Sequence, residues 1–163
     1  MSSPLQGANA LTACFTSGLM VQGTAAAAIN TSVAIQYAIN GRFAVAKTAM
    51  TSQAYACEPG TGILATAPNA FVSIPVGKAC AFAWLLDSAG AVTAAQGDIV
   101  DDIGAGTICP VPAIPPNRAV FGASKVRNTS AAAGVFIPGT TSHAATGVTA
   151  TYVNLSQHPG AGI

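Results

Sequence analysis

The chain has 163 residues, a formal net charge of +1 and only 7% charged residues. Average soluble domains carry about 25% charged residues, so charge is unusually scarce. A hydrophobic fraction of 51% with this low net charge excludes an intrinsically disordered chain. Six lysines and arginines are too few and too dispersed for the basic patch that nucleic acids or anionic membranes require. The length predicts one domain with a substantial core.

The N-terminal segment has no positive charge before Arg42, so we expect no secretory signal. No apolar stretch reaches the roughly 18 uninterrupted residues of a membrane-spanning helix. Four widely spaced cysteines form no C-x-x-C pair, which favours reduced thiols over a metal site or disulfides: Cys14, Cys57, Cys80 and Cys109. Surface charge keeps isolated proteins soluble. A surface with this little charge is therefore better tolerated in a permanently assembled protein.

Residues 1–30 are expected to form an irregular N-terminal arm. They are rich in Ala, Gly, Ser and Thr and contain no charged side chain. Gly18 and Gly23 argue against a long helix, because glycine is a poor helix former. We expect the arm to dock on another surface, and residues 31–163 to form a single β-sandwich domain.

A β-hairpin is predicted from residues 32–39 and 42–47. Asn40 and Gly41 separate these two runs and tolerate the positive φ angles of a two-residue type I′ turn. The turn sets the register of the predicted pairs: Ile39 with Arg42, Tyr37 with Ala44, and Ile35 with Ala46.

A second hairpin is predicted from residues 79–86 and 91–96. Its first strand alternates alanines with larger side chains, which is typical of a β-strand with one bulky face: Cys80, Phe82, Trp84 and Leu86. Asp87 and Gly90 suit the first and last positions of the turn between the two strands.

Further short strands are expected in the second half of the chain, at residues 118–126, 135–138 and 148–155. The proline-rich residues 110–116 predict an extended connector that cannot join a central sheet. Short strands with Gly and Pro between them, and no strong helical stripe, predict an all-β sandwich or barrel.

Asp98, Asp101 and Asp102 form an acidic cluster. Clustered oxygens can bind a hard cation, but this spacing does not match a calcium-binding loop. We interpret the segment as a solvated loop and expect neither a metal site nor a cofactor.

Two histidines are the available bases for nucleophilic catalysis, His143 in a polar loop and His158 near the end of the chain. Neither accompanies a catalytic serine or cysteine motif. We therefore interpret both as surface or interface residues and expect no enzymatic activity.

An ordered series of segments runs through most of residues 35–160: YAINGRF (37–43), LDSAGAV (86–92), QG (96–97), PAIPP (112–116), FGASKV (121–126), FIPGTT (136–141) and GVTATY (147–152). This series of turns and strands resembles the small head proteins of tailed bacteriophages, the capsid cement or decoration proteins. The resemblance implies a β-sandwich or jelly-roll-like fold and no catalytic residues. The alanine-rich arm lies outside it.

The resemblance also implies a structural role in the virion. Many copies would bind the outside of the icosahedral capsid, bridge subunits of the major capsid protein and resist the pressure of the packaged genome. We expect assembly in the host bacterial cytoplasm and self-association as a dimer or trimer, with no nucleic acid or membrane as partner.

Four residues of the uncharged arm are the first candidates for the capsid interface: Phe15, Leu19, Met20 and Val21. Packing in the core of the protein is an equally open alternative for these four side chains. One alternative for the whole protein is a tail, baseplate or head-fibre component, which copy number would distinguish. Another is a carbohydrate-binding surface module. That alternative requires export and an exposed aromatic platform, for which only Trp84 and three tyrosines are available.

Overall fold

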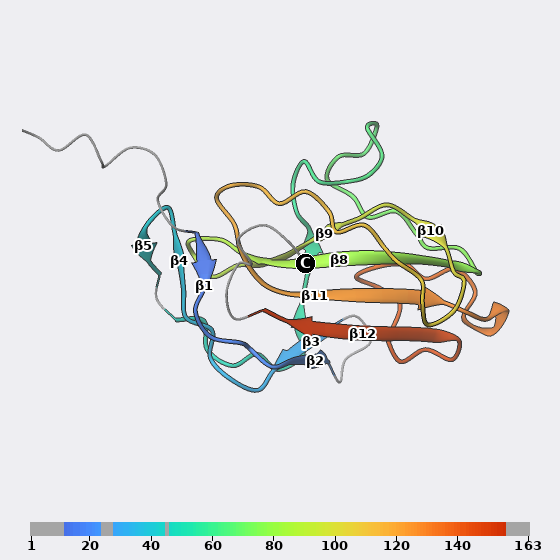
Figure 1. Ribbon diagram of the computed structural model, residues 1–163, viewed down its shortest axis with the longest axis horizontal. Coiled ribbons are helices and arrows are strands. Elements are labelled where there is room, and N and C mark those ends of the chain that lie inside the picture. Colours follow the sequence, from blue (N-terminus) through green and yellow to red (C-terminus); the bar gives the residue numbers. More distant parts are fainter. Residues whose placement is uncertain (1–11, 24–27, 45, 156–163) are drawn as a thin grey trace, which may run out of the picture.

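The protein is all-β, as predicted. The computed structural model describes residues 12–23, 28–44 and 46–155, and this part of the chain contains three sheets and one short 3-10 helix (Figure 1). The elements are β1 (Ala13–Cys14), β2 (Met20–Gln22), β3 (Ala28–Thr31), β4 (Tyr37–Ile39), β5 (Arg42–Phe43), β6 (Gln53–Ala54), β7 (Ala56–Cys57), β8 (Lys78–Leu86), β9 (Val92–Gln96), β10 (Val100–Asp101), β11 (Ala119–Asn128), η2 (Ala131–Ala133) and β12 (Val148–Asn154).

The largest sheet has six strands. Five follow the order β12-β11-β8-β9-β7, and β10 also pairs with β8. β8 is antiparallel to β9, β10 and β11, whereas β7 is parallel to β9. Phe82 pairs with Gln96 and Ala79 pairs with Val100, so β9 and β10 follow one another along the same side of β8. The long strands β8, β11 and β12 run side by side through the molecule (Figure 1).

β8 is buried on both faces, which explains its alternating sequence. Phe82 and Trp84 belong to the main core, whereas Ala83 and Leu85 belong to a smaller cluster on the opposite face. Ile114 of the proline-rich connector packs against this smaller cluster. Small side chains on that face of β8 therefore let the connector approach the sheet closely.

The turn between β8 and β9 has the predicted chemistry. The Asp87 carboxylate accepts hydrogen bonds from the backbone N–H groups of Ala89 and Ala91, both at 2.8 Å. Gly90 has a φ of 81°, and its N–H donates to the Asp87 carbonyl at 3.1 Å. The second predicted hairpin is thus confirmed.

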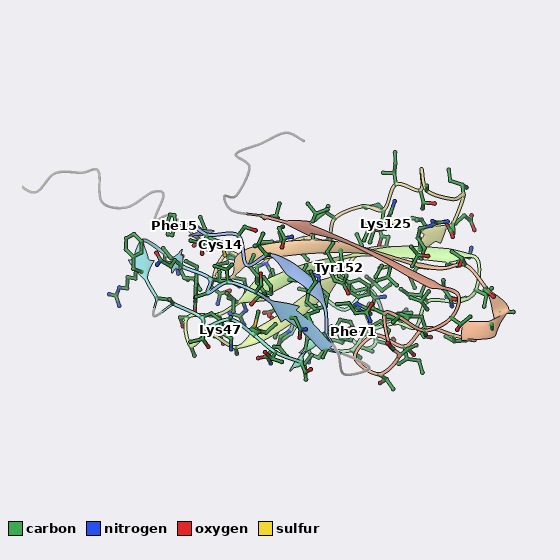
Figure 2. All side chains as sticks on the ribbon, turned by 90° about the horizontal axis from the view of Figure 1, so that it is seen from below. Cys14, Phe15, Lys47, Phe71, Lys125 and Tyr152 are labelled. Atoms are coloured by element: carbon green, nitrogen blue, oxygen red, sulfur yellow. The ribbon has the colours of Figure 1, made fainter. Side chains whose placement is uncertain are left out.

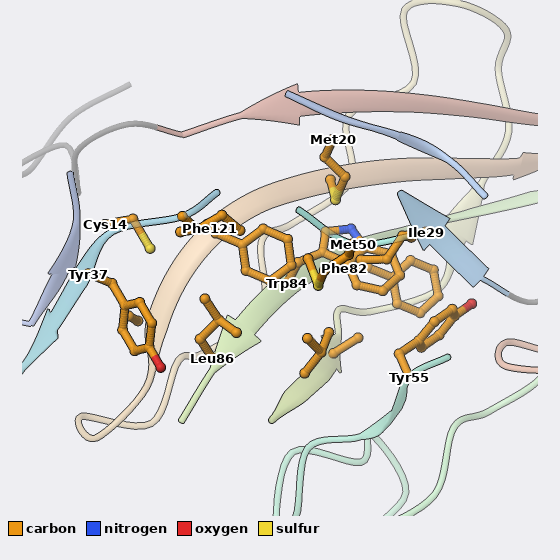
Figure 3. Close-up of a cluster of buried hydrophobic side chains, with 14 of the residues drawn as sticks. Cys14, Met20, Ile29, Tyr37, Met50, Tyr55, Phe82, Trp84, Leu86 and Phe121 are labelled. Atoms are coloured by element: carbon orange, nitrogen blue, oxygen red, sulfur yellow. The ribbon is translucent and has the colours of Figure 1, made fainter. Parts of the chain in front are cut away.

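The main core lies between the large sheet and the two small ones. The small sheets have the orders β1-β4-β5 and β2-β3-β6. Both contribute side chains to one hydrophobic cluster with the large sheet (Figure 3): Cys14, Met20, Ile29 and Tyr37 from the small sheets, and Phe82, Trp84, Leu86 and Phe121 from the large one. The fold therefore has two layers around one core.

The first predicted hairpin is confirmed at its turn. Asn40 and Gly41 have φ angles of 51° and 75°, as a type I′ turn requires. Ile39 pairs with Arg42, which is the predicted register. The turn thus sets the pairing of β4 with β5.

The predicted register of this hairpin is wrong further from the turn. The Ala44 N–H donates to the Tyr37 carbonyl at 3.1 Å, in agreement with the prediction. Ile35, however, pairs with Lys47 rather than with Ala46. One extra residue is therefore accommodated between Ala44 and Lys47, as in a β-bulge, which increases the local twist of a strand pair.

The strand predicted at residues 135–138 is also wrong. Phe136 forms only an isolated bridge with Ile74, through hydrogen bonds of 2.8 and 3.0 Å. Pro138 follows and offers no N–H group with which to continue a ladder. The strands predicted at residues 118–126 and 148–155 correspond to β11 and β12.

The described part of the expected N-terminal arm contributes strands to both small sheets. β1 pairs with β4, and β2 pairs with β3. The remaining residues of the arm, 1–11 and 24–27, lie outside the described residues.

Candidate interaction surface

A loop with large apolar side chains in solvent follows β10. Residues 102–113, called the apolar loop from here on, carry Ile103, Ile108 and Val111, which are 80%, 87% and 65% exposed. These are three of the four most exposed large apolar side chains in the described part of the chain. Burying such a side chain gains about 1.5–3 kcal/mol, so the loop favours contact with another surface.

Asp102 anchors the start of the apolar loop. Its Oδ1 accepts hydrogen bonds from the Gly104 N–H at 3.0 Å and from the Thr107 hydroxyl at 2.8 Å, and Arg127 Nε of β11 donates to it at 2.7 Å. The hydrogen bond from Arg127 is the main reason that the pKa of Asp102 is lowered to about 2. Its side chain is only 5% exposed, so the interpretation of this segment as solvated is wrong for Asp102.

Lys125 of β11 holds the middle of the apolar loop. Its Nζ donates to the carbonyls of Ala105 and Thr107 at 3.1 and 3.0 Å. Figure 2 labels Lys125 near one end of the molecule. Asp102 is the single charged residue of the loop itself. The sheet thus presents a preformed apolar protrusion whose one charged residue, Asp102, is paired with Arg127, and preorganisation lowers the entropic cost of binding.

The other two aspartates of the acidic cluster are exposed. Asp101 forms a surface ion pair with Lys78 at 2.6 Å, with side chains 80% and 40% exposed. Asp98 is exposed as well. Throughout residues 12–23, 28–44 and 46–155, no group of three His, Cys, Asp or Glu side chains is placed to hold a metal ion.

The four interface candidates from the arm do not form one surface. Leu19 and Val21 are 49% and 52% exposed, whereas Met20 is buried in the core, so for Met20 the core alternative holds. Phe15 packs against the exposed ring of Phe43, with ring centroids 5.3 Å apart. Figure 2 places Phe15 toward the opposite end of the molecule from the label of Lys125 and its loop.

His143 lies in the core, so its interpretation as a surface or interface residue is wrong. Its ring is 3% exposed. Nε2 lies 3.1 Å from the hydroxyl of Tyr55, and Nδ1 lies 2.6 Å from the hydroxyl of Tyr152. Burial lowers the pKa of His143 to about 4. Because both ring nitrogens contact tyrosine hydroxyls, the imidazole holds the loop against the core. His158 lies outside the described residues.

The buried position of His143 follows from aromatic packing that no local sequence pattern reveals. Its ring centroid lies 5.4 Å from that of Phe136 and 6.3 Å from that of Trp84. Phe136 lies seven residues before His143 in the same loop, whereas Trp84 belongs to β8, far from His143 in the sequence. The polar residues around it therefore gave a misleading signal of exposure.

The four cysteines are free thiols, and three of them are buried. Burial raises the pKa of Cys14 and of Cys80 to about 12. A thiol attacks as its thiolate, so these two side chains act as small apolar core residues at neutral pH.

No protein-family model matches this chain, and no curated protein or solved structure shows significant similarity to it. The described residues include no helix long and apolar enough to cross a membrane.

Proposed function

We propose that this protein is a structural virion protein that binds the outer surface of a tailed-phage capsid and bridges its subunits. The observation that carries the proposal is the apolar loop, in which Ile103, Ile108 and Val111 are exposed and residues 102–107 are anchored by hydrogen bonds from β11. An anchored apolar protrusion suits permanent burial against another protein. The resemblance of the segment order to capsid decoration proteins supports the same role.

Stabilisation of the shell would arise by repetition. Each copy that bridges subunits of the major capsid protein buries about 1,600 Å² in an interface of standard size. Because the loop is already ordered before binding, less of the binding free energy is lost as conformational entropy of the loop. Self-association as a dimer or trimer extends each bridge over more subunits. The copies assemble onto the capsid in the host bacterial cytoplasm.

A jelly-roll-like sandwich is the finer description of the fold that accompanies this proposal. The packing of two small sheets against one large sheet supports a sandwich. The antiparallel pairing of β8 with β9 and with β11 fits such an architecture.

The first experiment is to count copies per particle by quantitative mass spectrometry of purified virions from the source phage. Hundreds of copies, comparable with the major capsid protein, are expected. A handful of copies would indicate a tail, baseplate or head-fibre component and contradict binding over the whole shell. Absence from purified virions would contradict any role in the particle.

The contribution of the apolar loop is tested by co-sedimentation with capsids from which the protein has been removed. The double variant Ile103→Ser/Ile108→Ser is expected to bind at least about ten-fold more weakly, because central apolar anchors dominate interfaces. Val33→Ser is the matched control, since Val33 is 42% exposed outside the loop. Equal binding by both variants would show that the loop is not the capsid contact.

A further inference from the structure

A groove lies beside the β4–β5 turn, and the apolar loop has no part in it. It has a volume of about 680 Å³, within the range of about 300–1,000 Å³ that is usual for ligand sites. Its lining includes Asn40, Arg42 and Phe43 from the turn and β5, and Asn117 and Arg118 from the segment that leads into β11. Two segments far apart in the sequence thus contribute one arginine each to the lining of one groove.

Arg42 and Arg118 differ in how their charges are used. Arg42 is exposed, and within the described residues its side chain has no hydrogen-bond or ion-pair partner. Arg118 Nε lies 2.8 Å from Glu58 Oε1, and the Glu58 side chain is only 3% exposed. Glu58 also accepts a hydrogen bond from the Thr93 hydroxyl. The Glu58 carboxylate thus compensates the charge of Arg118, whereas the charge of Arg42 is uncompensated by any described residue.

The residues that line the groove include no carboxylate. Asp87 is the sequence neighbour of the lining residue Ser88, and its Oδ1 already accepts two hydrogen bonds from the backbone of its own turn. The groove therefore offers one arginine without a partner in the described structure, Arg42, to an incoming anion. A guanidinium group binds a carboxylate through paired, charge-assisted hydrogen bonds.

The remaining lining favours a peptide as the carrier of that anion. Phe43 is 79% exposed and offers a flat apolar surface next to Arg42. The amide side chains of Asn40 and Asn117 can donate to and accept from a peptide backbone. β5 is also an edge strand of its sheet, so its outer side is open to an extended segment.

We infer that this groove binds an acidic peptide segment of a partner protein, with a carboxylate on the guanidinium of Arg42 and an adjacent apolar side chain on Phe43. A nucleic acid is disfavoured as occupant, because it requires a longer run of cations than two arginines supply. The assignment of this peptide to a neighbouring subunit of the virion rests on the proposed function. Peptide binding itself is measurable on the isolated protein.

The test is a titration of the ¹⁵N-labelled full chain, followed by NMR, with the peptide acetyl-Leu-Glu-Leu-Glu-amide. Chemical-shift changes are expected in the backbone amides of residues 40–44 and 117–118. The peptide is added up to about 10 mM, so that dissociation constants in the millimolar range are detected. The matched peptide acetyl-Leu-Gln-Leu-Gln-amide is expected to bind at least about ten-fold more weakly, because it lacks the carboxylates.

Arg42→Gln is the informative variant, since Arg42 has no partner in the described structure that its loss would leave unpaired. It is expected to weaken binding of the acidic peptide at least about ten-fold, with Arg42→Lys intermediate because it keeps the charge but not the planar fork. Lys78→Gln removes one positive charge away from the groove and is expected to change the affinity less than about two-fold.

Three results would overturn the inference: no shifts at these amides, equal binding of the glutamine peptide, or equal weakening by Arg42→Gln and Lys78→Gln. Shifts produced at the groove by a single-stranded oligothymidylate and not by the acidic peptide would also overturn it. A protein that sediments with capsids but does not bind the peptide refutes the groove alone. Peptide binding without capsid binding refutes the proposed function alone.

Discussion

Arg127 Nε lies 2.7 Å from Oδ1 of Asp102, and this pair joins the end of β11 to the first residue of the apolar loop. The same carboxylate oxygen accepts hydrogen bonds from Gly104 and Thr107. One side chain therefore organises the first turn of the loop and ties it to the large sheet. The exposed isoleucines keep their positions because the polar atoms beneath them are satisfied.

Asp102→Asn is expected to loosen the apolar loop and to lower the free energy of unfolding by about 2 kcal/mol, since hydrogen bonds to a charged group are lost. Amide hydrogen exchange of residues 103–107 should accelerate. Asp101→Asn is the control, because its ion pair with Lys78 is on the surface and worth less than about 1 kcal/mol. Equal effects of the two variants would contradict the role of Asp102.

Acid should release the same loop only at very low pH. The pKa of Asp102 is lowered from its ordinary value of 3.8 to about 2, chiefly by the hydrogen bond from Arg127. Its contribution to stability is therefore complete above about pH 4 and is lost as the pH falls through about 2. The protection factors of the amides of residues 103–107, which correct for the intrinsic pH dependence of exchange, should fall relative to those of β8 between pH 4 and pH 2. Loosening that is already complete at pH 4 would contradict the prediction.

His143 should make the whole fold sensitive to mild acid. Burial lowers its pKa from 6.5 to about 4, so between these values the unfolded chain binds a proton that the folded protein excludes. The contribution of neutral His143 to the free energy of unfolding is fully present above about pH 6.5. It falls by about 3 kcal/mol as the pH decreases to about 4, because each pKa unit corresponds to about 1.4 kcal/mol.

Urea unfolding at pH 7.5 and pH 5.0 measures this effect of His143. The wild-type protein and His158→Gln should lose stability between the two values, whereas His143→Gln should lose about 2 kcal/mol less between them. An unchanged pH dependence in His143→Gln would show that this imidazole is not held neutral in the core.

The pair of Glu58 and Arg118 should behave as a buried ion pair. The two side chains are 3% and 19% exposed. Arg118→Gln leaves the Glu58 carboxylate without its cation, and removing one partner of such a pair costs about 3–5 kcal/mol. The double variant Glu58→Gln/Arg118→Gln should be more stable than Arg118→Gln alone. Urea unfolding of the full double-mutant cycle checks this, and additive costs would contradict the coupling.

The two hairpins were predictable from the sequence because their turns are local. Asn40 with Gly41, and Asp87 with Gly90, lie within a few residues of the strands that they join, and their backbone preferences set the first pairs. The register shift that pairs Ile35 with Lys47 is not determined by the residues of the turn. It depends on how the small sheet twists over the core.

The apolar loop and the buried histidine could not be predicted in the same way. Asp102 meets Arg127 only because β8 pairs with both β10 and β11, which places residues distant in sequence at one end of the sheet. His143 is buried because its loop, which also carries Phe136, packs against Trp84 of β8. Both outcomes depend on the register of several strands at once. That register cannot be deduced from the residue types and spacing within a single segment.

Gly122 is predicted to be necessary for the packing of Met20 against β11. A Cβ at position 122 would lie 2.9 Å from Met20 Cε and 3.2 Å from the carbonyl oxygen of Val153. Met20 Cε is the far end of a flexible side chain and can move, whereas the Val153 carbonyl is backbone, so Gly122→Ala should cost about 1 kcal/mol, at the low end for overpacked cores. Met20→Ala should cost about 2–5 kcal/mol, because it leaves a cavity.

The double variant Gly122→Ala/Met20→Ala distinguishes direct packing from independent effects. The new methyl group would occupy space that Met20 has vacated, so the combined cost should fall below the sum of the single costs by about 1 kcal/mol. Gly106→Ala is the control, since a Cβ at position 106 has no neighbour within 4 Å, and its change should stay within about 0.5 kcal/mol. Urea unfolding of the four proteins and the control measures these differences. If the costs of Gly122→Ala and Met20→Ala were simply additive in the double variant, direct packing of Met20 against Gly122 would be contradicted.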